Sequence, residues 1–409
     1  MRLKDVTEFC PAYSGGARND TVAFVPMEAL RYDSISQQEI PFDEARGKYT
    51  FFADGDLLFA KVTPCFENGN IAVAKDLKGG IGFGSSEIFV LRVKPGLNNR
   101  YLFYVVQASP FMDGGCATMC GVGGLKRMSP LFPRTFEWEI PNEKSQRQIV
   151  DYLDGRTAAI DARVAVLEKK LAAYKRLKAS VINRAVTRGL DPKAKLKDSG
   201  VDWIGKVPMG WEVRRIKDIA KPLQYGASEV GLEYDPDLPR YIRITDITQD
   251  GELRAEGAQS LSEEVAKPYL LRDGDILLAR SGATVGKAFV YRAQYGRGAF
   301  AGYMIRCRVM PDSAEFRFVY YWMLSSHYQA WKQRAISQAT IQNIGAEKYA
   351  NLTVPLPDLA EQRAIADYLD AECAKIDKMA ELATREIELY KKLKRSLINE
   401  VVTGKRKVA

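Results

Sequence analysis

The stretch QRQIVDYLD at Gln146–Asp154 recurs as QRAIADYLD at Gln362–Asp370. Outward from these copies, residues 141–187 align with residues 357–403 at a constant offset of 216 without a gap, and about 20 of the 47 positions are identical. Self-similarity at a fixed offset indicates an internal duplication. We therefore expect a chain made of two corresponding halves.

Both copies are predicted to be long helices. Each follows a proline, Pro141 or Pro357, and polar residues that favour helix starts come next. Apolar residues then recur at steps near 3.5, as at Ile160, Val164, Leu167, Leu171, Tyr174 and Val181. A helix from Ser145 to Thr187 would be about 63 Å long at 1.5 Å per residue. Because each apolar stripe needs a partner, we expect an antiparallel pair with pseudo-twofold symmetry.

The segments before the two helices also correspond, but more weakly. Asp54–Lys61 resembles Asp273–Arg280, and each indicates a turn that runs into a buried strand. Val90–Val93 matches Arg306–Val309 in the same way. Between such anchors the two sequences diverge, so we expect two domains that share a frame but differ in their loops.

The resulting prediction is an α+β protein with two variable domains separated by two long antiparallel helices with pseudo-twofold symmetry. We place the first domain at 1–140, a central helical spacer and linker at 141–206, the second domain at 207–356 and a C-terminal helical spacer at 357–409. Within the linker, Gly189–Pro208 is expected to be irregular. The segments that begin the domains, Arg2–Val6 and Arg215–Ile219, are expected to be strands or turns.

Composition is typical of a globular, cytoplasmic protein without a membrane segment. Of the 409 residues, 46% are hydrophobic and 27% are charged. The sequence has neither a run of 18 apolar residues nor the zones of a signal peptide. The net charge is +9, with the basic excess concentrated in 141–206, which permits nucleic-acid binding without a polycationic tail.

Residues that would carry chemistry are scarce. The six cysteines are scattered and are predicted to be buried thiols, and Cys116 and Cys120 lack the partners of a zinc site. The only histidine, His327, lies in an aromatic-rich stretch and is expected to be a packed or surface residue. Gly282–Lys287 is one residue short of a phosphate-binding loop, and Ala288 stands where Ser or Thr is needed. We expect no catalytic or metal site in this chain.

The sequence resembles the specificity (S) subunit of type I restriction-modification enzymes over essentially its whole length. The motifs that carry the resemblance are the two P-x4-QR-x-I-x-DYLD helix starts, the linker Asp198–Gly205 with Val207–Glu212, TPCFENGNIA at Thr63–Ala72 and RSGATVGKA at Arg280–Ala288. One departure is Ser145, which stands where the second copy has Glu361, the residue usual in the family.

The resemblance implies a DNA-reading role without catalysis. Each variable domain would be a target recognition domain that reads one half of a bipartite, asymmetric site in double-stranded DNA. The helices would hold the domains apart and dock two methyltransferase (M) subunits, with motor-nuclease (R) subunits joining for restriction. The chain itself would hold no cofactor, because S-adenosylmethionine, ATP and magnesium would belong to the partners.

Two loops are candidates for contact with DNA. Lys126 and Arg127 close the glycine-rich stretch Gly121–Arg127, and Gln342 and Asn343 lie in its counterpart by position. Asparagine and glutamine read adenine bidentately, although ordinary loop amides are equally common. Further candidates that follow the shared strands are Lys61, Asn68, Arg280, Ser281, Thr284 and Lys287.

Partner contacts are expected at the duplicated helix starts, at Gln146, Arg147, Tyr152, Gln362, Arg363 and Tyr368. The basic runs further along the helices are most simply solvated helix faces. An alternative function is a coiled-coil scaffold without sequence-specific DNA binding. Divergence confined to the domain interiors argues against a scaffold, and an enzyme acting alone would need motifs that the sequence lacks.

Overall fold

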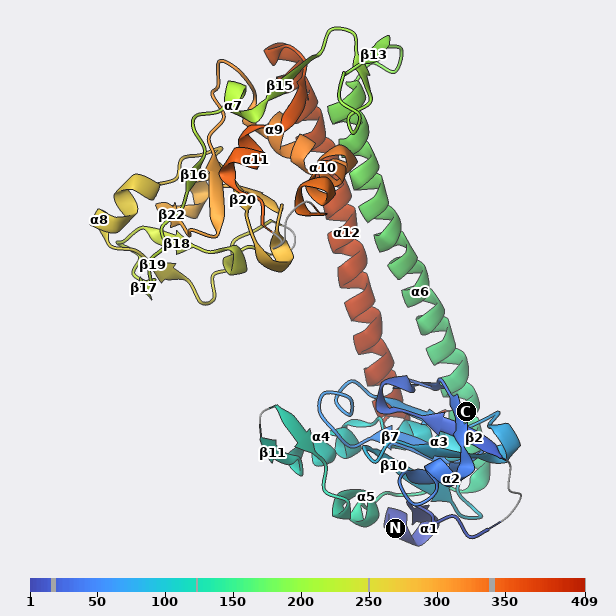
Figure 1. The fold of residues 1–409 in the computed structure, drawn as a ribbon. Coiled ribbons are helices and arrows are strands. Elements are labelled where there is room, and N and C mark those ends of the chain that lie inside the picture. Colours follow the sequence, from blue (N-terminus) through green and yellow to red (C-terminus); the bar gives the residue numbers. More distant parts are fainter. Residues whose placement is uncertain (16–19, 123, 249–250, 338–342, 409) are drawn as a thin grey trace. The chain divides into compact units, whose positions relative to one another are not determined.

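A computed structural model of the chain describes residues 1–15, 20–122, 124–248, 251–337 and 343–408. The chain forms two compact units, and each unit contains a segment of both long helices. Unit 1 comprises Met1–Glu168 and Thr384–Ala409, and unit 2 comprises Lys169–Ala383. The sheets of the two predicted variable domains therefore belong to different units (Figure 1).

The duplicated segments form two long helices, as predicted. Helix α6 spans Glu143–Arg188 with 46 residues, and helix α12 spans Leu359–Val402 with 44 residues. Asn142 caps the start of α6 by accepting the backbone N–H of Ser145 at 2.9 Å, and Asp358 caps α12 in the same way at 2.8 Å. Neither helix contains a proline, so the backbone hydrogen bonds continue without a break.

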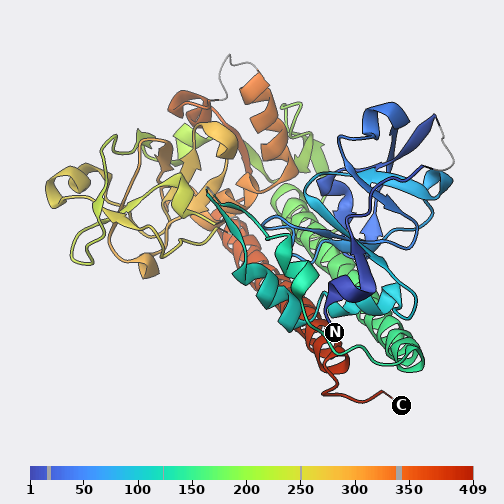
Figure 2. The same cartoon turned by 90° about the horizontal axis from the view of Figure 1, so that it is seen from below.

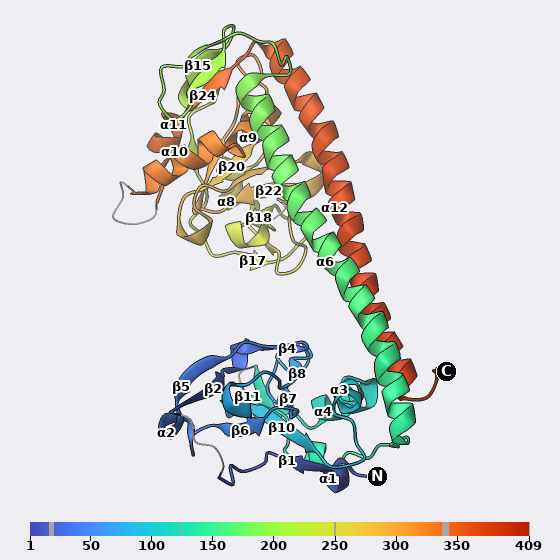
Figure 3. The same cartoon turned by 90° about the vertical axis from the view of Figure 1, so that its right-hand side faces the viewer.

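Within each unit the segments of α6 and α12 run antiparallel, side by side in all three views (Figures 1, 2 and 3). In unit 1, Lys394 Nζ lies 2.6 Å from a carboxylate oxygen of Asp161. In unit 2, Lys178 Nζ lies 2.6 Å from Asp377. The lysine comes from α12 and the aspartate from α6 in unit 1, whereas the reverse holds in unit 2. The pseudo-twofold duplication predicts this exchange.

The described residues of unit 1 form two four-stranded sheets, in the orders β1-β10-β7-β8 and β5-β2-β9-β6, with the two-stranded ribbons β3-β4 and β11-β12. The strand bounds are β1 Thr7–Phe9, β2 Thr21–Val25, β3 Leu30–Arg31, β4 Ser34–Ile35, β5 Gln38–Pro41, β6 Thr50–Ala53, β7 Leu57–Ala60, β8 Ile71–Val73, β9 Ile81–Gly84, β10 Ile88–Val93, β11 Cys120–Val122 and β12 Leu125–Arg127.

Unit 1 also contains short α-helices. Their bounds are α1 Leu3–Val6, α2 Phe42–Ala45, α3 Asn99–Val105, α4 Ser109–Ala117 and α5 Leu131–Thr135. The largest core of the unit combines Phe59 of β7, Phe103 of α3 and Phe111 of α4 with Leu153 of α6 and Val401 of α12. Both long helices are therefore part of the hydrophobic core of unit 1.

The described residues of unit 2 form the sheets β16-β23-β20-β21 and β17-β19-β18-β22, with the ribbons β13-β14 and β15-β24. The strand bounds are β13 Leu196–Asp198, β14 Lys206–Pro208, β15 Glu212–Arg215, β16 Gln224–Tyr225, β17 Leu232–Glu233, β18 Arg240–Ile242, β19 Gln259–Ser260, β20 Ile276–Ala279, β21 Ala288–Val290, β22 Gly298–Phe300, β23 Met304–Cys307 and β24 Thr353–Leu356.

Unit 2 also contains short α-helices, as unit 1 does. Their bounds are α7 Ile216–Ile219, α8 Glu263–Ala266, α9 Phe316–Met323, α10 Ser326–Ser337 and α11 Ala346–Ala350. Its largest core joins Leu278 of β20, Trp322 of α9 and Tyr328 of α10 to Val186 of α6 and Ile365 of α12. This core is therefore built like that of unit 1, with the two long helices exchanged.

Each domain is completed by the helix that follows the other domain in the sequence. Asn399 of α12 accepts the backbone N–H of Ser109 at 3.1 Å, at the start of α4 in unit 1. Asn183 of α6 accepts the backbone N–H of Ser326 at 3.1 Å, at the start of α10 in unit 2. The duplicated asparagines thus supply equivalent bonds to helix ends that would otherwise leave N–H groups unpaired.

The two aligned turn-and-strand motifs also have equivalent structures. Strands β7 and β20 are fully buried, as the sequence predicts. The aspartate before each strand is buried and forms an ion pair, Asp56 with Arg92 at 2.7 Å and Asp275 with Arg308 at 2.6 Å. The shared aspartates therefore have a structural role in both units.

Three sequence expectations need correction. The Gly189–Pro208 link contains the ribbon β13-β14, in which Ser199 donates its backbone N–H to Gly205 O at 2.9 Å. The segments that begin the domains include one-turn helices, α1 and α7, because Asp5 accepts the backbone N–H of Arg2 and Asp218 accepts that of Arg215. Cys116 and Cys120 are exposed rather than buried, since they lie at the surface end of α4 and on β11.

No helix in the described ranges is long and apolar enough to cross a membrane. The same residues contain no group of three or more His, Cys, Asp or Glu side chains placed to hold a metal ion.

Candidate nucleic-acid interface

In unit 1, three of the predicted DNA-binding residues lie around the end of strand β7. Lys61 follows this strand, and its backbone N–H donates to Glu87 O at 3.0 Å. Its carbonyl accepts the N–H of Met128 at 2.8 Å, and Val62 forms an isolated bridge with Arg127. The ribbon β11-β12, which contains Lys126 and Arg127, is thereby attached to the end of β7.

The hydroxyl of Thr63 fixes the ribbon further. It donates to Gly124 O at 2.9 Å and accepts the backbone N–H of Lys126 at 2.9 Å. The backbone N–H of Thr63 also donates to Lys126 O at 2.9 Å. The ribbon β11-β12 is thus attached by hydrogen bonds and carries exposed basic side chains.

Glu87 lies at the centre of this group. Its carboxylate accepts hydrogen bonds from Arg127 Nε at 3.1 and 3.0 Å and from Arg127 Nη2 at 2.9 Å. The hydrogen bond from Arg127 holds the pKa of Glu87 below its ordinary value, and the nearby positive charge of Lys61 adds to this effect. The group therefore combines one carboxylate with the basic side chains of Lys61, Lys126 and Arg127, so its net charge is positive.

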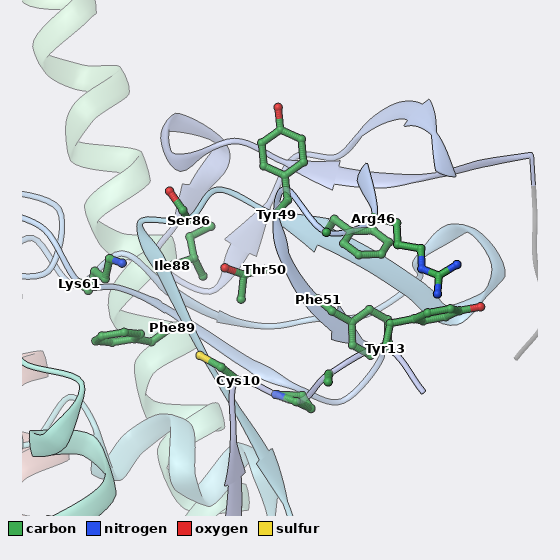
Figure 4. Close-up of a pocket in the computed structure, with 14 residues that line it drawn as sticks. Cys10, Tyr13, Arg46, Tyr49, Thr50, Phe51, Lys61, Ser86, Ile88 and Phe89 are labelled. Carbon is green, nitrogen blue, oxygen red and sulfur yellow. The ribbon is translucent and has the colours of Figure 1, made fainter. Parts of the chain in front are cut away.

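A cavity of about 480 Å³ opens beside this group, with aromatic walls and cationic edges (Figure 4). Lys61 Nζ lies 5.3 Å from the ring centre of Phe89, and the guanidinium of Arg46 lies 5.9 Å from that of Tyr13. Burial raises the pKa of the Cys10 thiol, which also lines the cavity. Such a surface combines rings that can stack with groups that attract phosphate.

Unit 2 repeats the backbone frame of this group with different side chains. The backbone N–H of Arg280 donates to Tyr303 O at 3.0 Å, and Arg280 O accepts the N–H of Ile344 at 2.8 Å. Ser281 forms an isolated bridge with Asn343. Arg280 therefore corresponds to Lys61, Tyr303 to Glu87 and Asn343 to Arg127.

The side chains of unit 2 keep unused hydrogen-bonding capacity. The guanidinium carbon of Arg280 lies 4.9 Å from the ring centre of Tyr225, whose hydroxyl accepts the N–H of Ala346 at 2.9 Å. Within the described ranges, the buried Nε of Arg280 and the buried Oδ1 of Asn343 have no hydrogen-bond partner. Gln342, predicted to act with Asn343, lies outside the described residues.

The remaining predicted DNA contacts are not part of these two groups. Asn68 is exposed on the segment between β7 and β8. Thr284 and Lys287 line another cavity, of about 550 Å³, together with Lys332. Lys287 Nζ donates to the carbonyl of Thr248.

Two of the residues predicted to contact partner subunits are buried in this structure. Gln146 and Gln362 are only 0% and 1% exposed, so they offer no surface to another subunit. Gln146 accepts from Asn98 N at 2.8 Å and donates to Pro141 O, and Gln362 accepts from Glu315 N at 2.9 Å. Both glutamines instead tie the helix starts to the domains.

The other predicted partner contacts reach the surface. The side chains of Arg147 and Arg363 are 73% and 59% exposed. Tyr368 is exposed and Tyr152 is half-buried. A hydrogen bond from Arg406 lowers the pKa of Tyr152, so the two tyrosines differ in their surroundings.

Sequence reasoning missed Glu87, Tyr303 and Tyr225. A signal for the first two was present, because extending the Val90–Val93 alignment upstream at the same offset pairs Glu87 with Tyr303. Tyr225 had no such signal, since only the fold brings its ring under Arg280. Glu361 also gains a role, because it accepts the indole N–H of Trp211 at 3.2 Å.

Residues 208–388 match the family model described as type I restriction modification DNA specificity domain. This match agrees with the resemblance to the type I restriction-modification specificity subunits seen in the sequence.

Curated relatives agree with this match. The chain is similar to the type I restriction enzyme EcoEI specificity subunit of Escherichia coli, with 33% identity over 154 residues. That match covers 37% of this chain and only about a quarter, 26%, of the relative. The MjaVIII specificity subunit of Methanocaldococcus jannaschii is 24% identical over 328 residues, with 76% of this chain and 71% of the relative covered.

Solved structures share the fold over almost the full chain. A structure described as "Structural basis underlying complex assembly and conformational transition of the type I R-M system" aligns with a TM-score of 0.74 and 18% identity, and covers 98% of this chain and 96% of that one. The HsdS subunit from Thermoanaerobacter tengcongensis aligns with a TM-score of 0.50 and 19% identity, covering 98% and 95%.

Proposed function

We propose that this chain is the DNA sequence-specificity subunit of a type I restriction-modification complex, and that each unit reads one half of a bipartite site. The observation that carries the proposal is the repeated frame around the ends of β7 and β20. Lys61 and Arg127 in one unit stand where Arg280 and Asn343 stand in the other. A shared scaffold with different donors and acceptors is what reading two different half-sites requires.

The proposed site is asymmetric for the same reason. The group in unit 1 is cationic and contains the Glu87 carboxylate, whereas the equivalent position of unit 2 carries the amide of Asn343, whose Oδ1 is buried without a partner among the described residues. An amide can pair bidentately with adenine, and an arginine with guanine. A coiled-coil scaffold without DNA specificity, the alternative function, gives no reason for such differences at equivalent surface positions.

The chain is proposed to perform no catalysis. S-adenosylmethionine, ATP and magnesium are expected on the methyltransferase and motor-nuclease subunits, and the assembly is expected to act on DNA in the cytoplasm. Purified chain incubated with labelled S-adenosylmethionine and DNA should transfer no methyl groups until the methyltransferase subunit is added. Transfer by the chain alone would contradict this part of the proposal.

Two methyltransferase subunits are proposed to bind one chain. The exposed pair Arg147 with Arg363, together with the half-buried Tyr152 and the exposed Tyr368, marks two related surfaces, which implies two copies of one partner. Native mass measurement should show two methyltransferase subunits per chain. A stable complex with only one, even with the partner in excess, would argue against equivalent surfaces.

The DNA-reading role is tested by finding the methylated site. The assembled methyltransferase should be incubated with a library of randomised duplexes, and the methylated molecules sequenced. We expect two short specific blocks, different from each other and separated by unread base pairs. A palindromic site, a contiguous site or no sequence preference would contradict the proposal.

A further inference from the structure

The pairing of Arg127 with Glu87 leaves one edge of the guanidinium free. An arginine carries five N–H donors in a planar fork. Glu87 accepts from Nε and from Nη2, which occupies the side edge of the fork. The terminal edge, made of Nη1 and the second hydrogen of Nη2, remains directed away from the carboxylate.

The side chain that carries this terminal edge reaches the surface of unit 1. The side chain of Arg127 is 48% exposed, while that of Glu87 is 25% exposed and lies further inside. The carboxylate therefore binds the guanidinium through its side edge and does not occupy the terminal edge. A guanine presents two acceptors, O6 and N7, on its major-groove edge, and they match two parallel N–H donors.

The backbone that carries Arg127 is held as firmly as its side chain. Val62 bridges to Arg127, and Thr63 bonds to both the backbone carbonyl and the backbone N–H of Lys126. Met128, the next residue, donates to Lys61 O at 2.8 Å. A donor pair fixed before binding loses little conformational freedom when a base arrives.

The charges of the group also suit DNA. A carboxylate near phosphates is normally unfavourable, but Glu87 is neutralised by Arg127 and lies close to Lys61, whose charge remains for the DNA backbone. In unit 2 the corresponding residues are Tyr303 and Asn343, so no carboxylate holds an arginine there. The Glu87–Arg127 arrangement is therefore particular to the half-site read by unit 1.

We propose that Arg127 reads a guanine in the first half-site and that Glu87 is the positioning residue that presents its terminal edge. This inference rests on the proposed DNA-reading function. Glu87 makes no base contact in this arrangement, and its effect passes through Arg127. The guanine would be read at one base pair only, because the fork spans a single pair of acceptors.

The test uses the assembled methyltransferase on the randomised duplexes, with base preference measured at every position. Arg127→Lys keeps the charge but removes the planar fork, so preference for guanine at one position should fall about 10- to 100-fold. Glu87→Gln should lower the same preference by about threefold or more, because a neutral amide holds the guanidinium less firmly. In an Arg127→Lys background, Glu87→Gln should have no further effect.

A matched control is the exposed pair of Glu263 with Arg297 in unit 2, which forms two parallel hydrogen bonds at 2.6 and 2.7 Å. Glu263→Gln removes the same kind of charge at a comparable surface pair. It should leave the first half-site unchanged. Thermal melting should be the same for Glu87→Gln and Glu263→Gln, which separates positioning of Arg127 from a general effect on folding.

The possible results separate this inference from the function on which it rests. If wild-type complex shows no sequence preference, the proposed function fails. If it reads a bipartite site but Arg127→Lys weakens methylation of all duplexes equally, Arg127 contacts phosphate and the inference is overturned. A preference changed by Arg127→Lys but untouched by Glu87→Gln would remove the positioning role of Glu87.

Discussion

Replacing Gln146 with alanine distinguishes a structural glutamine from a partner contact. The side chain is buried and makes three hydrogen bonds to the backbone of unit 1. It accepts from Asn98 N at 2.8 Å and donates to Gly96 O at 3.0 Å and to Pro141 O at 2.8 Å. In Gln146→Ala all three backbone groups lose their partner inside the fold.

The expected cost follows from these three groups. A buried polar group left unpaired costs about 1–3 kcal/mol, and water entering the vacated space can satisfy part of the loss. We expect the free energy of unfolding of unit 1 to fall by about 3 kcal/mol. In a domain of about 150–250 residues, such a loss lowers the Tm by about 6–12 °C.

The neighbouring residue Arg147 provides the control. Its side chain is 73% exposed and lies 3.6 Å from Glu143 on the same helix, so Arg147→Ala should cost no more than about 0.5 kcal/mol. Calorimetry should report the Tm of both variants, and hydrogen exchange should show that the loss of protection in Gln146→Ala is confined to unit 1. Binding of the methyltransferase subunit should be measured at a temperature where both variants are folded.

One outcome would refute the reasoning directly. If Gln146→Ala unfolded like the wild type but bound the methyltransferase poorly, Gln146 would be a partner contact as the sequence first suggested. We expect the reverse, with Arg147→Ala weakening partner binding while leaving stability nearly unchanged.

Three further predictions concern reading, spacing and pH. Changing Gln342 and Asn343 to alanine should relax one half-site only, at about 1–3 kcal/mol per bidentate contact, and equal loss at both halves in the duplex library would contradict it. Inserting four residues after Leu167 and four after Ala383 adds about 6 Å to each helix and should lengthen the unread DNA spacer between the half-sites by about two base pairs. An unchanged DNA spacer in a folded, active variant would mean that partner subunits set the distance. Burial lowers the pKa of His327 in the folded chain, so protonation favours unfolding and the stability of unit 2 should fall as the pH drops below about 6.5. His327→Gln should remove this part of the pH dependence in thermal melts, and an identical profile in both proteins would count against it.

The sequence alone determined the frame of this protein. Helix periodicity and capping are local properties, so the duplicated segments that begin after Pro141 and Pro357 were sufficient to predict α6 and α12. The buried strands β7 and β20 were predictable for a similar reason, since a turn followed by a short apolar run specifies a buried strand. The duplication also contributed to the family resemblance and predicted the pairing of the two helices.

The tertiary structure decided which side chains meet. Gln146 looks like a surface residue at a polar helix start, yet its side chain is buried and bonds to the backbone of Gly96 and Asn98, which are distant in sequence. Glu87 and Arg127 are 40 residues apart, and only the sheet register and the bridge from Val62 bring them together. Hydrogen bonding across a fold depends on where separate strands end in space, and no local pattern in the sequence encodes that position.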